Sequence, residues 1–112
     1  MGLLNEICKA NGIRLGRYSD NATVIESSGL AHLTHYRGFS AIPTNGQPII
    51  YYDDGAPADG IPFTVAHEIG HILMGHLSNR SRKPEEIEAD IFAAVLTALV
   101  TYDKVRSKPS AA

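Results

Sequence analysis

The most informative stretch of this sequence is HEIGH, residues His67 to His71. Residues four apart lie on one face of an α-helix, so His67 and His71 can bind one metal ion from successive turns. In such a motif the glutamate, here Glu68, acts on a water molecule at the metal rather than on the metal itself. An amphipathic helix that carries two histidines by chance is the alternative. The motif favours a zinc site in which the ion acidifies water and Glu68 takes the proton.

A second, acidic segment offers the third ligand that such a site requires. A catalytic zinc has three protein ligands and one position open for water. Glu86 and Asp90 lie four apart, so Glu86 can bind the metal while Asp90 accepts a hydrogen bond from a ligand histidine. Glu88 lies about 200° around the helix from Glu86 and faces elsewhere. Acidic residues also favour helix N-termini, which would explain Glu86 but not Asp90, an acid within an apolar run. The small side chains of Ala89 and Ala93 would let this helix approach the histidine helix closely.

Segments 61–76 and 86–94 together resemble the ImmA/IrrE family of metallopeptidases. The first reads IPFTVAHEIGHILMGH, with a Phe-Thr pair before the histidines, and the second reads EIEADIFAA. The resemblance implies a gluzincin-type zinc metalloendopeptidase with one Zn²⁺ per chain. The implied metal ligands are His67, His71 and Glu86. Glu68 would be the general base, and Asp90 would orient a histidine. Residues 1–60 are similar to the family only in architecture.

The same resemblance implies a substrate class. The substrate would be a protein, namely a helix-turn-helix transcriptional repressor of a mobile element or stress regulon, which points to phage or prophage regulation. An alternative function is a zinc-binding regulatory module that binds a repressor without cutting it. The two functions differ in whether repressor fragments appear only when Glu68 is intact.

Two other kinds of zinc site match less well. A structural site would need a fourth ligand, and the single cysteine, Cys8, is far from the motif in sequence. A site with a third histidine at His76 would need glycine and histidine where Met74 and Leu77 stand. We therefore expect His76 to lie on the surface or behind the ligands.

Length and composition indicate one domain over residues 1–112. Hydrophobic residues make up 44% of the chain and charged residues 20%, a balance typical of a globular protein. The net charge of −2 gives no basic surface for direct nucleic-acid binding. No apolar segment reaches membrane-spanning length, and the N-terminus lacks a secretion signal, so we expect a cytoplasmic protein that binds no membrane. Cys8 is expected to be a buried apolar residue of the first helix.

The apolar patterns predict an α+β fold. Leu3–Ala10 has the pattern of a short amphipathic helix, and Asn11-Gly12 ends it. Short β-prone runs follow at residues 22–25, 30–36, 39–42 and 48–52. An Asn-Gly turn lies within residues 44–47. These runs predict a small, mainly antiparallel sheet of three to four strands, packed on the N-terminal helix and the two zinc-site helices. The second zinc-site helix is apolar on most sides and is expected to be the buried central helix.

The run Ile49, Ile50, Tyr51, Tyr52 has two interpretations. As an edge strand beside the zinc helix, it would bind an extended substrate through backbone hydrogen bonds. As an ordinary strand, it would only pack the sheet. A peptidase also needs a side chain that stabilises the oxyanion. Six residues stay open for that role: Tyr36, Tyr51, Tyr52, Tyr102, His32 and His35.

Overall fold

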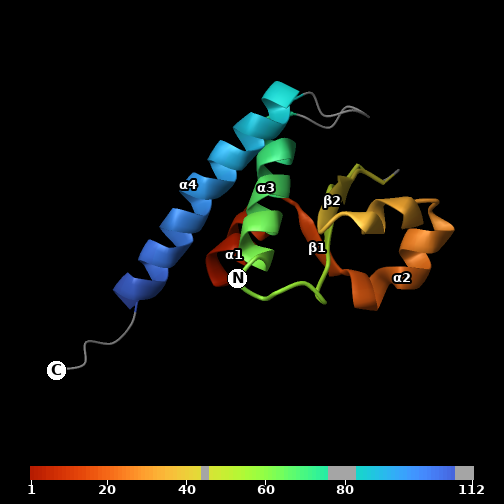
Figure 1. Cartoon of the computed structure of the whole chain (residues 1–112), viewed down its shortest axis with the longest axis horizontal. Helices are drawn as coiled ribbons and strands as arrows, with labels where there is room; N and C mark the ends of the chain where they lie inside the picture. The colour runs from red at the N-terminus through yellow and green to blue at the C-terminus, as the bar shows by residue number, and fades with distance from the viewer. Residues whose placement is uncertain (44–45, 76–82, 108–112) are drawn as a thin grey trace.

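The computed structural model describes residues 1–43, 46–75 and 83–107. Its elements are α1 (Gly2–Ala10), β1 (Arg14–Arg17), α2 (Tyr18–Ser27), the 3₁₀ helix η1 (Ala31–His35), β2 (Gly38–Ala41), β3 (Ile49–Tyr52), α3 (Ile61–Leu73) and α4 (Lys83–Ser107). Figure 1 shows the strands and α2 on one side, α3 in the middle, and α4 along the opposite side. The predicted α+β fold class is confirmed, and α1 matches the predicted N-terminal helix.

The sheet has three strands in the order β1-β3-β2, so β3 is the central strand. β2 pairs with β3 in the antiparallel sense, whereas β1 pairs with β3 in the parallel sense. The sheet is therefore mixed rather than mainly antiparallel as predicted. The reason is that parallel neighbours need a long crossover connection, and the chain between β1 and β3 provides one that contains α2, η1 and β2.

Two of the predicted strands are wrong. Residues 22–25 lie in α2, and residues 31–35 of the run 30–36 form η1. The β-branched residues of the first run favour a strand, but packing outweighs this preference. Ile25 is the buried residue of α2 and contacts the sheet beside Phe39 and Tyr51. A helix laid on the sheet can bury one such residue and leave its neighbours in water.

The central strand supplies side chains to two separate cores. Alternate residues of a strand point to opposite faces of the sheet. Ile49 and Tyr51 belong to a smaller core beneath α2 and η1, whereas Ile50 and Tyr52 pack in a larger core with α1, α3 and α4. Cys8 lies in the larger core and is 2% exposed, as expected for an apolar role. Burial raises the pKa of its thiol to about 11.

The prediction that the second zinc-site helix is the buried central helix is wrong. One stripe of α4 is buried, formed by Ala89, Ala93, Leu96 and Val100. The rest of the helix is largely exposed, and α3 occupies the centre instead, between α4 and the sheet (Figure 1). An apolar pattern shows that a face avoids water but not that this chain provides a partner for it. Although α4 is 25 residues long, neither it nor another described helix has the sustained apolar character needed to cross a membrane.

Close contact between β2 and α3 depends on Gly38. A Cβ atom added there would lie 2.7 Å from Thr64 Cγ2 and 3.1 Å from the Tyr51 carbonyl oxygen. We predict that Gly38→Ala lowers the free energy of unfolding by about 1–3 kcal/mol, the usual cost of overpacking. Urea denaturation measures this loss. Gly2→Ala is the control, because nothing lies within 4 Å of its new Cβ atom. Equal stabilities for Gly38→Ala and wild type would contradict the close packing of β2 on α3.

Candidate metal centre

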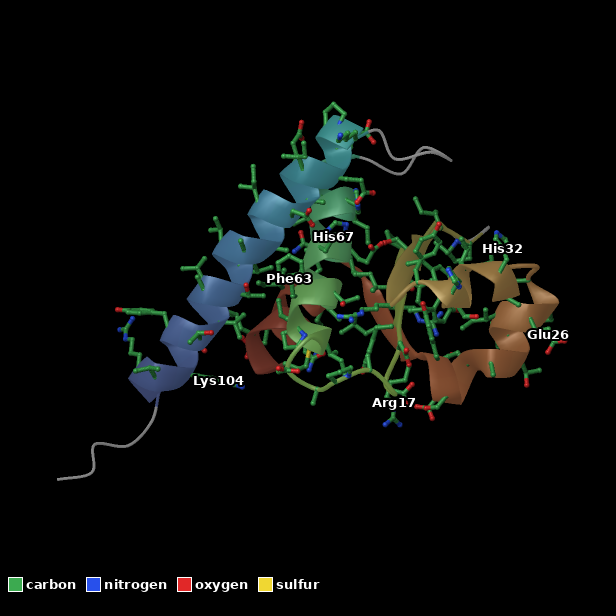
Figure 2. All side chains as sticks on the ribbon, viewed as in Figure 1. Arg17, Glu26, His32, Phe63, His67 and Lys104 are labelled. Atoms are coloured by element: carbon green, nitrogen blue, oxygen red, sulfur yellow. The ribbon has the colours of Figure 1, made fainter. Side chains whose placement is uncertain are left out.

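Helix α3 carries the histidine motif on a scaffold with a fixed orientation. Pro62 lies in its first turn, where no backbone donor is needed, and Gly75 follows its end with a φ of +73°. Three fully buried side chains anchor one face to the larger core: Val65, Ala66 and Ile69. Their burial fixes the rotation of the helix about its axis. His67, which is labelled in Figure 2, is thereby turned toward α4. His71 also contacts α4, through Glu86.

The side chains of His67, His71 and Glu86 converge. His67 Nε2 lies 3.0 Å from His71 Nε2 and 3.0 Å from Glu86 Oε2. His71 Nε2 lies 3.2 Å from Glu86 Oε1. Ligand atoms around a tetrahedral zinc with bonds of about 2.0–2.1 Å would lie about 3.3 Å apart. The observed spacings and the donor set of two imidazoles and a carboxylate both fit a catalytic zinc ion.

Small residues allow α3 and α4 to approach closely enough for this convergence. Ala89 and Ala93 are 0% exposed on the side of α4 that packs against α3, as expected from their size. On α3, a Cβ atom added to Gly70 would lie 3.0 Å from Phe92 Cδ1. The glycine between the two histidines therefore leaves room for the Phe92 ring, and the packing brings Glu86 to the histidines.

Asp90 lies on the opposite side of the His67 ring from Glu86 and His71, which together with His67 form the ligand group. Its Oδ1 is 2.8 Å from His67 Nδ1. A carboxylate at this distance accepts a hydrogen bond from Nδ1–H, which leaves the Nε2 lone pair directed at the other two ligands. The sequence predicted a contact of this kind for Asp90, whose role in orienting a ligand histidine stays a prediction.

Replacement of Asp90 tests this orienting contact. We predict that Asp90→Ala keeps the fold and lowers the affinity for Zn²⁺ by about 10–100-fold, the usual cost of losing such a partner. Competition with a chromogenic chelator measures the affinity. Asp103→Ala is the matched control, because Asp103 is also an exposed acid of α4 but lies near its C-terminal end. An unchanged zinc titration for Asp90→Ala would show that the contact does not support metal binding.

Glu68 lies beside the ligand group and is held by the sheet. The Ser40 hydroxyl on β2 donates a hydrogen bond of 2.7 Å to Glu68 Oε1. Burial raises the pKa of the Glu68 carboxyl above its usual value and outweighs the hydrogen bond from Ser40 and the charges of His71 and His67, which act in the opposite direction. A carboxylate with a raised pKa is a better proton acceptor near neutral pH.

Ser40 is the residue of this centre that sequence reasoning missed. It lies 28 positions before Glu68, and no motif links the two. Its neighbours form a short β-prone run that gives no sign of which helix the strand contacts. Only the pairing of β2 with β3 and its packing on α3 bring the Ser40 hydroxyl to Glu68.

The predicted substrate strand Ile49–Tyr52 requires a correction. This strand is β3, which is paired with β1 on one side and with β2 on the other. Its backbone groups are used within the sheet, so it has no edge to offer a peptide. β2 is an outer strand of the sheet and contacts α3, and within the described residues no strand pairs with its other edge. The free edge beside the candidate centre therefore belongs to Gly38–Ala41.

The structure narrows the candidates for oxyanion stabilisation. Tyr102 lies about 24 Å along α4 from Glu86, at about 1.5 Å per residue, and Tyr51 is buried in the smaller core, on the sheet face away from α3. Both are too remote from the ligand group. The remaining four stay predictions: His32, His35, Tyr36 and Tyr52. His76 lies outside the described residues.

Comparison with known families agrees with this arrangement. The family model for the IrrE N-terminal-like domain, peptidase family M78, matches residues 18–106. The match includes both histidines, Glu68, Glu86, Asp90 and Ser40. No curated protein and no solved structure matches the chain. The matched segment covers most of the sequence and supports the resemblance seen in the two motifs: this chain belongs to the IrrE N-terminal-like family of peptidases.

Proposed function

We propose that residues 1–112 form one zinc-dependent metallopeptidase domain of the gluzincin type, which cleaves a cytoplasmic protein. The observation that carries the proposal is the convergence of His67, His71 and Glu86, whose ligand atoms all lie within 4.8 Å of one another. Glu68 lies beside them, bonded to Ser40. Membership of a peptidase family supports the same reaction class.

Each residue of the centre would have a separate role in peptide hydrolysis. A zinc ion held by the three ligands would supply Lewis acidity toward the peptide carbonyl and toward water. Glu68 would accept a proton from the attacking water and deliver it to the leaving amine. Ser40 would keep the Glu68 carboxylate in place during both transfers, and Asp90 would keep the His67 ring in its ligating orientation.

The edge of β2 is the proposed binding site for the substrate backbone. An extended peptide can add to an open sheet edge through main-chain hydrogen bonds. A peptide bound along Gly38–Ala41 would lie beside α3, and Ser40 ties this strand to the base. Such a peptide must be extended, so the cleaved segment would be a flexible part of the substrate rather than its folded core.

The proposed substrate is a helix-turn-helix transcriptional repressor of a mobile element or stress regulon. The resemblance of the two motifs to the ImmA/IrrE family supports this choice, and the match to the IrrE N-terminal-like model supports that resemblance. A DNA-binding substrate also accounts for the proposed cytoplasmic location, and a repressor of a mobile element would make the peptidase a phage or prophage regulator.

Incubation of the purified chain with Zn²⁺ and the repressor encoded beside it tests the proposal. Intact-mass spectrometry should detect two fragments that together account for the whole repressor and one added water. A chelator should abolish the fragments, and excess zinc should restore them. A repressor that binds tightly but stays whole under these conditions would identify a zinc-dependent regulatory module instead of a peptidase.

A further inference from the structure

The outward flank of α4 carries an apolar surface that the metal centre does not use. Six large apolar side chains on this flank are each more than half exposed. We call them the outer stripe: Ile87 (52%), Ile91 (60%), Val95 (57%), Leu99 (53%), Tyr102 (63%) and Val105 (65%). At about 100° per residue they lie opposite the buried stripe that packs against α3. In Figure 1, α4 forms one edge of the molecule, so this flank faces away from α3 and the sheet.

The outer stripe is large for a surface left in water. Six such side chains, each more than half exposed, present on the order of 600 Å² of apolar area, the upper end of the patches on monomeric proteins. Two stripes packed together would bury up to about 1,200 Å², the lower end of the range for specific and stable interfaces. A second copy of this chain is therefore sufficient to cover the surface.

The spacing within the stripe suits another helix. Four residues of the outer stripe and the exposed Ala98 between them follow one another at alternating steps of four and three residues: Ile91, Val95, Ala98, Tyr102 and Val105. This alternation is the heptad pattern by which two helices pack along a continuous seam. The seam is about 21 Å long at about 1.5 Å per residue, so an interface along it is long and narrow.

Charges at the two ends of the stripe select an orientation. Glu88 and Arg106 lie at nearly the same angle around α4, within the stripe, one near each end of the helix. In an antiparallel pair, Glu88 of each copy would face Arg106 of the other. In a parallel pair, Glu88 and Arg106 would lie at opposite ends of the interface and could not pair. The charge pattern therefore favours antiparallel helices related by a two-fold axis.

We propose that two copies of this chain associate through the outer stripes of their α4 helices, packed antiparallel. The metal ligand Glu86 lies on the other flank of α4, where it contacts His67. The proposed interface therefore leaves the candidate metal centre accessible in both copies.

Sedimentation velocity of the full chain tests the association. Wild type should sediment at twice the chain mass of 12.1 kDa over micromolar concentrations, and Val95→Glu should sediment as a monomer. Val24→Glu is the matched control, because Val24 is a valine on α2 with a similar exposure of 51% and should leave the dimer intact. Circular dichroism and zinc binding confirm that each variant is folded. Wild type that stays monomeric, even if another protein binds the stripe, would overturn the proposal, as would a dimer that survives Val95→Glu.

A charge exchange tests the orientation. Glu88→Arg should weaken the dimer by about tenfold, because it brings two arginines together at each end of the interface. Addition of Arg106→Glu to the same chain should restore the wild-type dissociation constant, since each end again pairs opposite charges. A double variant that associates no better than Glu88→Arg alone would overturn the antiparallel arrangement.

Discussion

Replacement of Glu68 by glutamine is expected to slow cleavage by orders of magnitude while zinc stays bound. Glutamine has the size and helix propensity of glutamate, and its amide oxygen can still accept the hydrogen bond from Ser40. It cannot accept a proton from water, so the cleavage rate should fall by about 10²–10⁴-fold, the usual contribution of general-base catalysis. Cleavage assays give the rate, and metal analysis of the purified variant gives the zinc content.

The control for this experiment is Glu26→Gln, a change of the same charge on the exposed surface of α2 (Figure 2). It should leave both cleavage and zinc content as in wild type. If Glu68→Gln cleaved at the wild-type rate with zinc bound, Glu68 would not be the base. If Glu68→Gln lost its zinc, the experiment would instead assign Glu68 to the ligands, and the roles within the motif would have to be reassigned.

Loss of any one of the three proposed ligands should have the second large effect, a loss of affinity for zinc. His67→Ala, His71→Ala and Glu86→Ala are each expected to lower the affinity for Zn²⁺ by more than about 100-fold, beyond the loss predicted for Asp90→Ala. His71→Ala should also destabilise the fold in the absence of zinc, because its side chain is 5% exposed and its removal leaves a cavity. Glu86 is 43% exposed, so Glu86→Ala should leave the stability of the metal-free protein nearly unchanged.

Glu88→Ala is the control for the ligand variants. Glu88 is an exposed acid on the same helix turn as Glu86 but faces away from α3. Its replacement should leave zinc affinity intact. If Glu88→Ala lost the metal and Glu86→Ala kept it, α4 would have a different rotation about its axis from that in the structure.

The parts of the site that could be predicted are those that helix periodicity alone determines. His67 and His71 are four apart, as are Glu86 and Asp90, so each pair shares a face wherever its helix lies. To predict the contact of Asp90 with His67 requires one further inference, that the two helices pack against each other. Ser40 could not be predicted because its position depends on the order of the strands. That order depends on β1, whose sequence of Arg14, Leu15, Gly16 and Arg17 carries little β preference.

The burial of α4 and β3 shows a related limit of prediction from sequence. Both segments are rich in large apolar residues, and only β3 is buried on both sides. The difference arises from neighbours distant in sequence: Arg14 in β1 aligns with Ile49, whereas the outer flank of α4 meets no described element. An apolar pattern reports the tendency of a segment to leave water. Which partner it finds is decided by the whole chain, and for α4 that partner lies outside one copy in our proposal.

The division of the proposed ligands between α3 and α4 has a consequence for folding. The two histidines belong to one helix and Glu86 to the other, so a metal ion bound by all three would cross-link the two helices. This chain has a single cysteine, buried in α1, and cannot form such a link through an internal disulfide. Metal binding that requires the folded arrangement adds its free energy to folding. The ion would then raise the melting temperature of the domain in addition to supporting its reaction. In a cell depleted of zinc, the domain would lose both its activity and the metal cross-link between α3 and α4.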